Sequence, residues 1–408
     1  MKRGLGLLAA MVLGVSVAHA QSDGDFSFGD MDWAFDVLDD PLDHASDLDL
    51  DFEADDIIGL NLGAESLSLL TAQGFRIGAR RRLPTLQLML FSIRAPLGLP
   101  LRKALGVLRA LDPGGFYDSN VKFGLAEATA PTSAACEGVR CYGHELIGWP
   151  RSCDARVRIG IVDSAVNSAH PALAGRHIEQ RRFARGGLAA DHGTAIATQL
   201  AGAENSEFPG LLPQAELFVA DVFSTNDDGT VSTDTVRLVT GLDWIASQRP
   251  AVVNLSIAGP ESRVLAAAVR RMQDSGITLV AAAGNLGPDA PPQYPAAYPD
   301  VIAVTAIDRR LNIYPSANRG DYLSVAAPGV DIWTPAAGSA GVFRQGTSYA
   351  APYVTAAVAL ESLHHPDEKP AALREALQRK ARDLGEPGFD PVYGWGLVQA
   401  KGCRTGAQ

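Results

Sequence analysis

Apolar positions along the chain follow two patterns, which change between residues 125 and 157. In the first part, short apolar stretches alternate with amphipathic ones. We expect strands at 56–62, on both sides of Leu83–Pro84 within 75–93, and at 117–125, with helices at 64–74 and 99–113. This βαββαβ order predicts a small α+β sandwich.

From residue 157 the strand candidates are almost continuously apolar, and helical stretches at 233–248 and 262–276 separate several of them. Such strands indicate a parallel sheet covered on both faces, hence an α/β domain whose sites lie at the carboxyl ends of the strands. The candidate strands are 157–163, 216–223, 251–257, 277–285, 301–307 and 322–329.

The first twenty residues are typical of a secretory signal peptide. Lys2 and Arg3 precede a short apolar run, and Ala18 to Ala20 form a small-x-small cleavage site. Later segments do not reach the roughly 18 consecutive apolar residues of a membrane helix. We therefore expect a soluble, secreted or periplasmic protein without a membrane anchor.

Charge changes the picture only near the N-terminus. Between Gln21 and Asp56 the chain has thirteen Asp and one Glu but no Lys or Arg, whereas its net charge is −11. The rest is almost neutral and has no basic patch, which argues against nucleic-acid binding. The acidic segment is best interpreted as a disordered leader, because it lacks the Gly and Glu spacing of a calcium loop.

Four cysteines follow the signal peptide, and an even number in an exported protein favours disulfides. Three pairings exist. We favour Cys136–Cys141 as a local bridge and Cys153–Cys403 as a bridge between the ends of the last domain. A zinc site is less favoured, because neither short spacing is C-x-x-C.

Three residues together predict a nucleophilic site. Asp163 ends a buried strand, His192 opens a helix of small residues, and Ser348 lies at the start of a helix that contains Pro352. A serine needs a base to take its proton, and the base needs a third group to orient it. Ser348 is surrounded by helix-terminal N–H groups that bind an oxyanion, and Asn285, after another strand, supplies a second donor.

The order Asp, His, Ser and the motifs around these residues resemble the subtilase family of serine peptidases. The motifs are "IVDSAVN", "HGTAIA", "AAAGN" and "GTSYAAPYV", supported by "VAAPG" and "GWGLVQA". The resemblance covers residues 157–400 and implies a subtilisin-like fold. It also implies catalytic roles for Asp163, His192 and Ser348 and an oxyanion role for Asn285.

The resemblance further implies that residues 55–128 are a propeptide, which helps folding, inhibits the enzyme and is removed by self-cleavage between about Phe123 and Pro150. The expected organisation is a signal peptide at 1–20, an acidic leader at 21–54, the propeptide, a linker with the cleavage region at 129–150 and the peptidase domain at 151–408.

The substrate is expected to lie extended along one strand, with a second segment as the other wall of the pocket. Ala258 stands where the family usually has Gly, which leaves pocket depth and specificity open. The expected substrate-binding residues are Leu255, Ser256, Ile257, Ala258, Gly259, Ala283 and Gly284.

The expected partners are polypeptide substrates and the chain's own propeptide, in a monomer. The chemistry requires no metal; Ser224–Thr230 is a candidate calcium loop, although a plain turn is favoured. Other interpretations explain less. An esterase would need a G-x-S-x-G motif, which is absent, and a structural protein would leave the motifs unexplained. A silent or propeptide-blocked binding protein with the same fold stays the main alternative.

Overall fold

The computed structural model describes residue 52 and residues 56–126, 128–129, 142–150, 153–336, 341–400 and 403. The expected signal peptide, almost all of the acidic leader and the proposed Cys136–Cys141 bridge lie outside these residues. Among the described helices, none is long and apolar enough to cross a membrane.

The N-terminal domain is a four-stranded antiparallel sheet with two helices. Its strands lie in the order β2-β3-β1-β4. Leu70 of one helix and Leu108 of the other are buried against one face of the sheet, around Ile57 and Ile93. In chain order the elements are β1 (Ile57–Leu60), α1 (Ala64–Ala72), β2 (Arg76–Leu83), β3 (Leu88–Arg94), α2 (Leu101–Leu111) and β4 (Phe116–Ser119).

The last expected strand of this domain is in fact two strands. β4 ends at Ser119, and β5 (Lys122–Leu125) leaves the N-terminal sheet to pair with two strands of the C-terminal domain. The prediction of one continuous strand at 117–125 was therefore wrong. Local apolar pattern does not identify a strand's partner, and here the partners change within three residues.

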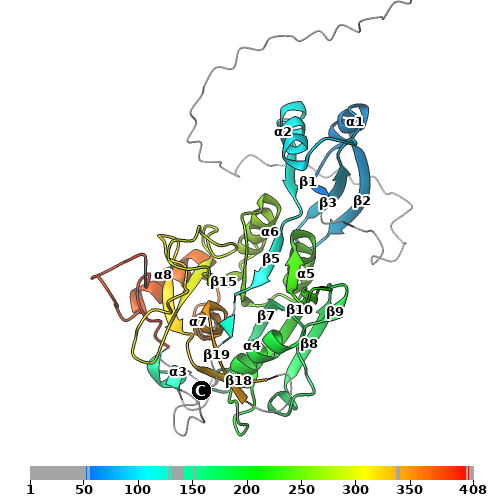
Figure 1. Cartoon of the computed structure of the whole chain (residues 1–408). Coiled ribbons are helices and arrows are strands. Elements are labelled where there is room, and N and C mark those ends of the chain that lie inside the picture. Colours follow the sequence, from blue (N-terminus) through cyan, green and yellow to red (C-terminus); the bar gives the residue numbers. More distant parts are fainter. Residues whose placement is uncertain are drawn as a thin grey trace, which may run out of the picture. The chain divides into compact units, whose positions relative to one another are not determined.

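The C-terminal domain is built on a seven-stranded parallel sheet, in agreement with the predicted α/β class (Figure 1). The strand order is β17-β16-β15-β13-β7-β10-β8. The strands are β7 (Arg158–Asp163), β8 (His177–Arg182), β10 (Glu216–Asp221), β13 (Val252–Leu255), β15 (Thr278–Ala282), β16 (Ile302–Ile307) and β17 (Val325–Pro328).

Helices cover both faces of this sheet, because successive side chains of each strand point to opposite sides. In β7, Ile161 belongs to the apolar cluster that also contains residues of α4 (Asp191–Ala201), α7 (Thr347–His364) and α8 (Pro370–Lys380). Val162 belongs to a second cluster, which contains residues of α5 (Thr235–Ser247) and α6 (Arg263–Asp274). Helix α5 begins two residues later than expected, since Asp234 accepts a hydrogen bond from Arg237 N as its N-cap.

Short elements complete the domain. They are α3 (Tyr142–Leu146), a 3₁₀ turn (Pro171–Leu173), β6 (Ala128–Thr129), β9 (Gly187–Leu188), β11 (Ser224–Thr225), β12 (Val231–Asp234), β14 (Ile257–Ala258), β18 (Ile332–Pro335) and β19 (Gly341–Gln345). Strands β14, β5, β12, β11 and β9 form one small sheet, and β18, β19 and β6 form another.

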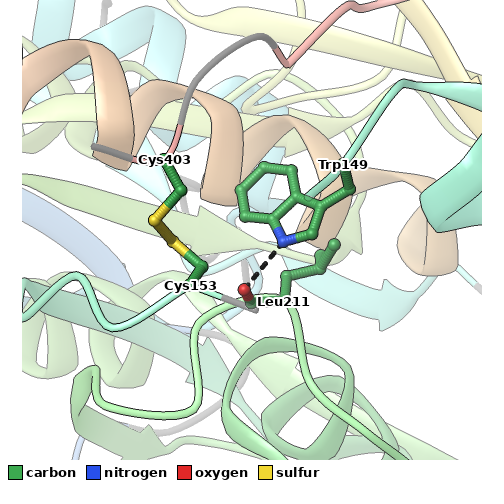
Figure 2. Close-up of a disulfide and its surroundings, with 4 residues drawn as sticks. All are labelled: Trp149, Cys153, Leu211 and Cys403. Carbon is green, nitrogen blue, oxygen red and sulfur yellow. Dashed lines mark hydrogen bonds between the residues drawn. A yellow bond between two sulfur atoms is a disulfide. The ribbon is translucent and has the colours of Figure 1, made fainter. Parts of the chain in front are cut away.

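A disulfide joins the two ends of the C-terminal domain. Cys153 and Cys403 are bonded across a sequence separation of 250, with Cα atoms 5.6 Å apart. Figure 2 shows Trp149 beside this bridge, where its indole N–H donates to the carbonyl oxygen of Leu211 at 2.9 Å. The disulfide and the indole hydrogen bond therefore hold Trp149 and Cys153, at the start of the domain, against Leu211 and Cys403.

Candidate active site

Asp163 and His192 form a buried pair at the carboxyl end of the parallel sheet. The imidazole Nδ1 lies 2.8 Å from Asp163 Oδ1 and 2.9 Å from Oδ2, and both side chains are buried. Asp163 Oδ1 also accepts the N–H of Ser164 at 2.7 Å. The carboxylate is therefore held in place and fixes the tautomer in which Nδ1 carries the proton.

The approach of helix α4 to the sheet depends on Gly193. A Cβ atom at this position would lie 2.3 Å from the carbonyl oxygen of Ser164, closer than atoms pack. Gly193 N also donates to Ser164 Oγ at 2.9 Å. The missing side chain thus lets the first turn of α4 bring His192 against Asp163.

Ser348 is the second residue of helix α7. The residue before this helix is Gly346, whose φ of 140° only glycine adopts easily. Pro352 is the sixth residue of this helix. The N–H that proline lacks would have bonded the carbonyl oxygen of Ser348, which instead accepts from the hydroxyl of Ser256 at 3.0 Å. The N–H of Ser348 itself lies in the first turn, where it has no partner within the helix.

The carbonyl oxygen of Ala126 lies at the head of this helix. Ser348 N donates to it at 3.2 Å, Asn285 Nδ2 donates to it at 2.5 Å, and the Ser348 hydroxyl is in contact with it. Two donors from separate elements therefore converge on one carbonyl oxygen of the chain itself. This is the geometry of an oxyanion hole.

The amide of Asn285 is oriented by Thr347. Asn285 Oδ1 accepts the N–H of Thr347 at 3.1 Å and its hydroxyl at 3.0 Å, so that Nδ2 must point toward the carbonyl of Ala126. Thr347 Oγ1 also accepts from Gly284 N at 3.1 Å. Sequence reasoning did not give Thr347 a role; its position next to the serine is the signal that could have found it.

The residues before Ala126 lie as a strand between two others. Leu125 and Gly124 of β5 pair with β14, and Phe123 pairs with β12 on the opposite side. Ala126 N donates to the carbonyl oxygen of Ser256 at 3.3 Å. Of the residues expected to bind substrate, Ser256, Ile257 and Ala258 thus contact the chain's own residues 124–126, whereas Leu255 pairs within the parallel sheet and Gly259 pairs with Tyr294. The pairing with β12 was not predicted.

Gly259 makes room for an aromatic side chain in this cleft. The ring of Phe123 is buried, and a Cβ atom at Gly259 would lie 2.3 Å from its Cδ1 atom. Phe123 is the fourth residue counted back from the carbonyl carbon that the two donors face, Ala126 being the first. The missing side chain of Gly259 therefore leaves the space that the ring of Phe123 occupies.

The other predicted wall is held by Tyr322. Its hydroxyl donates to the carbonyl oxygen of Ala283 at 2.9 Å. Burial raises the pKa of Tyr322 to about 12, so the hydroxyl keeps its proton and remains a donor. Ala283 and Gly284 are thereby fixed immediately before Asn285.

The candidate calcium loop, Ser224–Thr230, forms the turn between β11 and β12. Asp228 Oδ1 accepts from both the N–H and the hydroxyl of Thr230, at 2.9 and 2.6 Å, and Asn226 donates to Thr230 and Ser232. Within the described ranges, His, Cys, Asp and Glu do not form a group of three or more that could hold a metal.

Similar proteins were found at the level of sequence. Subtilisin DY from Bacillus licheniformis is 32% identical over 256 residues, which cover 60% of this chain and 90% of that protein. Subtilisin E from Bacillus subtilis (strain 168) is 30% identical over 296 residues, 70% of this chain and 71% of that protein. The match to the minor extracellular protease Epr of the same strain spans 52% of this chain but 33% of that relative.

Solved structures share the fold. Fervidolysin from Fervidobacterium pennivorans, a keratinolytic enzyme related to subtilisin, superimposes with a TM-score of 0.70 at 23% identity, over 85% of this chain and 60% of that one. The family model described as the subtilase family matches residues 154–396, more than half of the chain. The chain therefore belongs to the subtilase family of serine peptidases.

Proposed function

We propose that this protein is a secreted serine endopeptidase, made as a precursor that cuts its own chain between Ala126 and Glu127. The observation that carries the proposal is the carbonyl of Ala126, which accepts hydrogen bonds from Ser348 N and Asn285 Nδ2. This bond lies near the start of the interval left open by the sequence. Export agrees with the relative named as an extracellular protease.

The buried pair supplies the proton transfers. His192 takes the hydroxyl proton of Ser348 at Nε2 as the serine oxygen attacks the carbonyl carbon, and it later gives that proton to the leaving nitrogen. Asp163, bound to Nδ1, holds the ring and stabilises its protonated form. Water then replaces the leaving amine: His192 takes a proton from it as it attacks the acyl carbon, and returns that proton to Ser348 Oγ as the acyl group leaves.

The N–H of Ser348 and the amide of Asn285 stabilise the negative oxygen that forms during the attack. Both donors are fixed before the reaction, one by the helix and the other by Thr347, so little reorganisation is needed as charge develops. The substrate pairs with β12 and β14 as an added strand, as residues 122–125 do in the precursor.

The N-terminal domain is proposed to act as the inhibitor of the enzyme. Its tail fills the cleft, and the domain is fastened nearby through Asp118, whose Oδ2 accepts from Arg263 N at 2.6 Å and from Ser262 Oγ at 3.1 Å. These bonds cap the N-terminus of α6 and do not involve the scissile bond. The domain therefore stays bound after the cut, until it is displaced or degraded.

Intact mass of the exported protein tests the self-cleavage. The wild type is expected to start at Glu127, whereas Ser348→Ala stays unprocessed. Ser362→Ala is the matched control, since Ser362 lies on the same helix and donates only to the carbonyl oxygen of Ala359. Wild type and Ser348→Ala processed at the same bond would overturn self-cleavage.

A fluorophosphonate label tests the peptidase claim separately. Labelling of the wild type but not of Ser348→Ala supports an active serine. Absence of labelling in a fully processed wild type would favour the alternative, a silent binding protein with this fold. Absence of labelling only while the N-terminal domain is bound would favour the blocked form.

The chain's own segment also suggests which peptides are cut. Phe123 in its pocket and Ala126 at the bond point to substrates with an aromatic residue four positions before the bond and a small residue next to it. Peptides ending in Phe-Gly-Leu-Ala before a reporter should be cut faster than peptides with Asp in place of Phe. Gly259→Val should remove this preference, because its side chain fills the ring pocket.

A further inference from the structure

Three charged residues end three neighbouring strands of the parallel sheet. Asp163 is the last residue of β7, Asp221 of β10 and Arg182 of β8. In the sheet register Asp221 pairs with Asp163 on one side and with Arg182 on the other. Because neighbouring strands lie about 4.8 Å apart, the three side chains form one row that starts at the carboxylate bound to His192.

Asp221 is a second buried carboxylate beside the reacting groups. Its side chain is 1% exposed, and its Oδ2 accepts from Arg182 Nη1 at 3.0 Å. Its Oδ1 is buried and has no hydrogen-bond partner among the described residues. Burial raises the pKa of Asp221 to about 6, against the opposite effect of Arg182, and the charge of Asp163 adds to the rise.

Arg182 also reaches the loop that leads to the helix of His192. Its Nη2 donates to the carbonyl oxygens of Gly186 and Gly187, at 3.1 and 3.3 Å. Further along this loop, the carbonyl oxygen of Ala189 accepts from Ala165 N at 2.8 Å, and α4 begins at Asp191. One guanidinium therefore contacts both the second carboxylate and the backbone that leads into α4.

The fold alone does not require this row. The buried carboxylate of Asp221 loses its hydration although the side chain of Arg182 stays 34% exposed, and an apolar residue at such a position is often at least as stable. The row lies beside the Asp163–His192 pair, where a fixed charge acts through a poorly screened interior. A role in the reaction would explain why these charged residues lie at this end of the strands.

We infer that Arg182 and Asp221 form a positioning pair of the peptidase reaction, in which Asp221 balances the charge of Arg182 beside Asp163 and Arg182 fixes the loop before the histidine helix. This inference rests on the proposed function. The pair acts through the orientation and protonation of His192 and does not touch the substrate.

Other charged groups near Asp221 have different partners. On α4, Asp191 forms an ion pair with Arg344. On α5, across the sheet, Asp243 accepts from Leu86 N, and Arg237 binds Asp234. Thus the described charged groups that act directly on Asp221 are Arg182 and Asp163.

The direction of each effect follows from charge. Asp221→Asn leaves the positive Arg182 unbalanced and disfavours a protonated imidazole. The acidic limb of the kcat/KM profile should then move to lower pH by about 0.5–1 unit, the size expected for one buried charge at this range. Asp221→Asn with Arg182→Met removes both charges and should bring the midpoint back toward that of the wild type.

The experiment is the pH dependence of kcat/KM for the processed enzyme, with the serine labelling rate against pH as a second readout. Arg270→Met and Asp274→Asn are the matched controls, since they remove the same charges from an exposed ion pair on α6. Arg182→Lys, which keeps the charge but not the two-sided contact, should keep the midpoint and lower kcat. If Asp221→Asn does not accumulate, the double variant still tests the inference, because it removes both charges and so restores the charge balance.

A midpoint that moves in Asp221→Asn and returns in the double variant supports the inference. If Asp221→Asn does not accumulate, a double variant with the wild-type midpoint supports the inference, and one with a moved midpoint overturns it. Suppose that the wild type is active and that Asp221→Asn, the double variant and the α6 controls all have its pH midpoint of kcat/KM. That result overturns this inference but leaves the proposed function intact. A wild type that neither hydrolyses peptides nor takes the label overturns the proposed function, and this inference with it.

Discussion

The two domains cover their sheets in different ways. The C-terminal sheet is buried on both faces by its own helices. Helices α1 and α2 cover one face of the N-terminal sheet. On its other face, Ile58, Leu60 and Leu90 belong to the same apolar cluster as residues of helices α5 and α6. The N-terminal domain thus completes its packing against the C-terminal one.

Hydrogen bonds also join the N-terminal domain to the C-terminal domain. Asp118 caps helix α6, and Asp243 of α5 accepts from Leu86 N at 2.8 Å. A helix N-terminus and a single backbone N–H are small contacts, worth about 1 kcal/mol each. Further bonds join the two domains, among them one from Val236 N to Asn120 Oδ1 and one from Arg81 Nη1 to Thr240 Oγ1, both at 3.3 Å, and the shared apolar cluster adds to them.

The disulfide gives the largest expected difference between the domains, because residues 56–126 contain no cysteine. In a Ser348→Ala chain, Cys153→Ala with Cys403→Ala should lower the free energy of unfolding of the C-terminal domain by about 2–5 kcal/mol. Denaturant unfolding without reductant measures this change. Equal midpoints with and without the bridge would contradict a stabilising role.

Asn285 connects the two domains through the carbonyl of Ala126. Asn285→Ala should lower kcat by about 10²–10³, or about 2.7–4 kcal/mol of barrier, with little change in KM. Self-cleavage in the same variant should slow to a similar extent, since the same donor serves both reactions. The exposed Asn312→Ala is the control. A variant slow on peptides but normal in maturation would separate the two sites.

Acid should weaken only the C-terminal domain through His144, since residues 56–126 contain no histidine. Burial lowers the pKa of His144 to about 4, against an ordinary value of 6.5. The unfolded chain therefore binds a proton more readily. Stability is fully present above pH 6.5 and is lost as pH falls to about 4, by up to about 3 kcal/mol.

His144→Phe should make the melting temperature of the C-terminal domain depend less on pH between these values, because phenylalanine keeps a ring at this position but has no site for the proton. The original ring packs edge-on against Tyr353 at 5.9 Å between centroids. The exposed His364→Phe is the control. An unchanged slope in His144→Phe would show that another group causes the acid loss.

The smallest expected effect concerns Asp118, which forms hydrogen bonds between the two domains. Asp118→Asn in a Ser348→Ala chain should weaken the cap on α6 and cost about 1 kcal/mol, visible as a lower melting temperature of the N-terminal domain. Glu65→Gln, on the exposed side of α1, is the control for charge. A shift of equal size in both variants would mean that net charge, and not the cap, is responsible.

Residue pattern alone predicted the parallel sheet, because strands buried on both faces must be apolar throughout. It also singled out Asp163, His192, Ser348 and Asn285, since polar groups at the ends of buried strands and helices need partners. The structure brings Asp163 against His192, and Ser348 and Asn285 onto one carbonyl. Their catalytic roles remain the proposal that the variants test.

Only the tertiary structure decided which strands meet. Sequence could not separate β4 from β5, since both are short, lie two residues apart and differ in their partners. It also gave no sign that β12 would pair with β5 on the side opposite β14. It also passed over Asp221 and Arg182, which are 39 residues apart along the chain. Local pattern fixes which face of a strand is buried, but strand order and register come from long-range packing, and these brought the row of charges and Ala126 to the site.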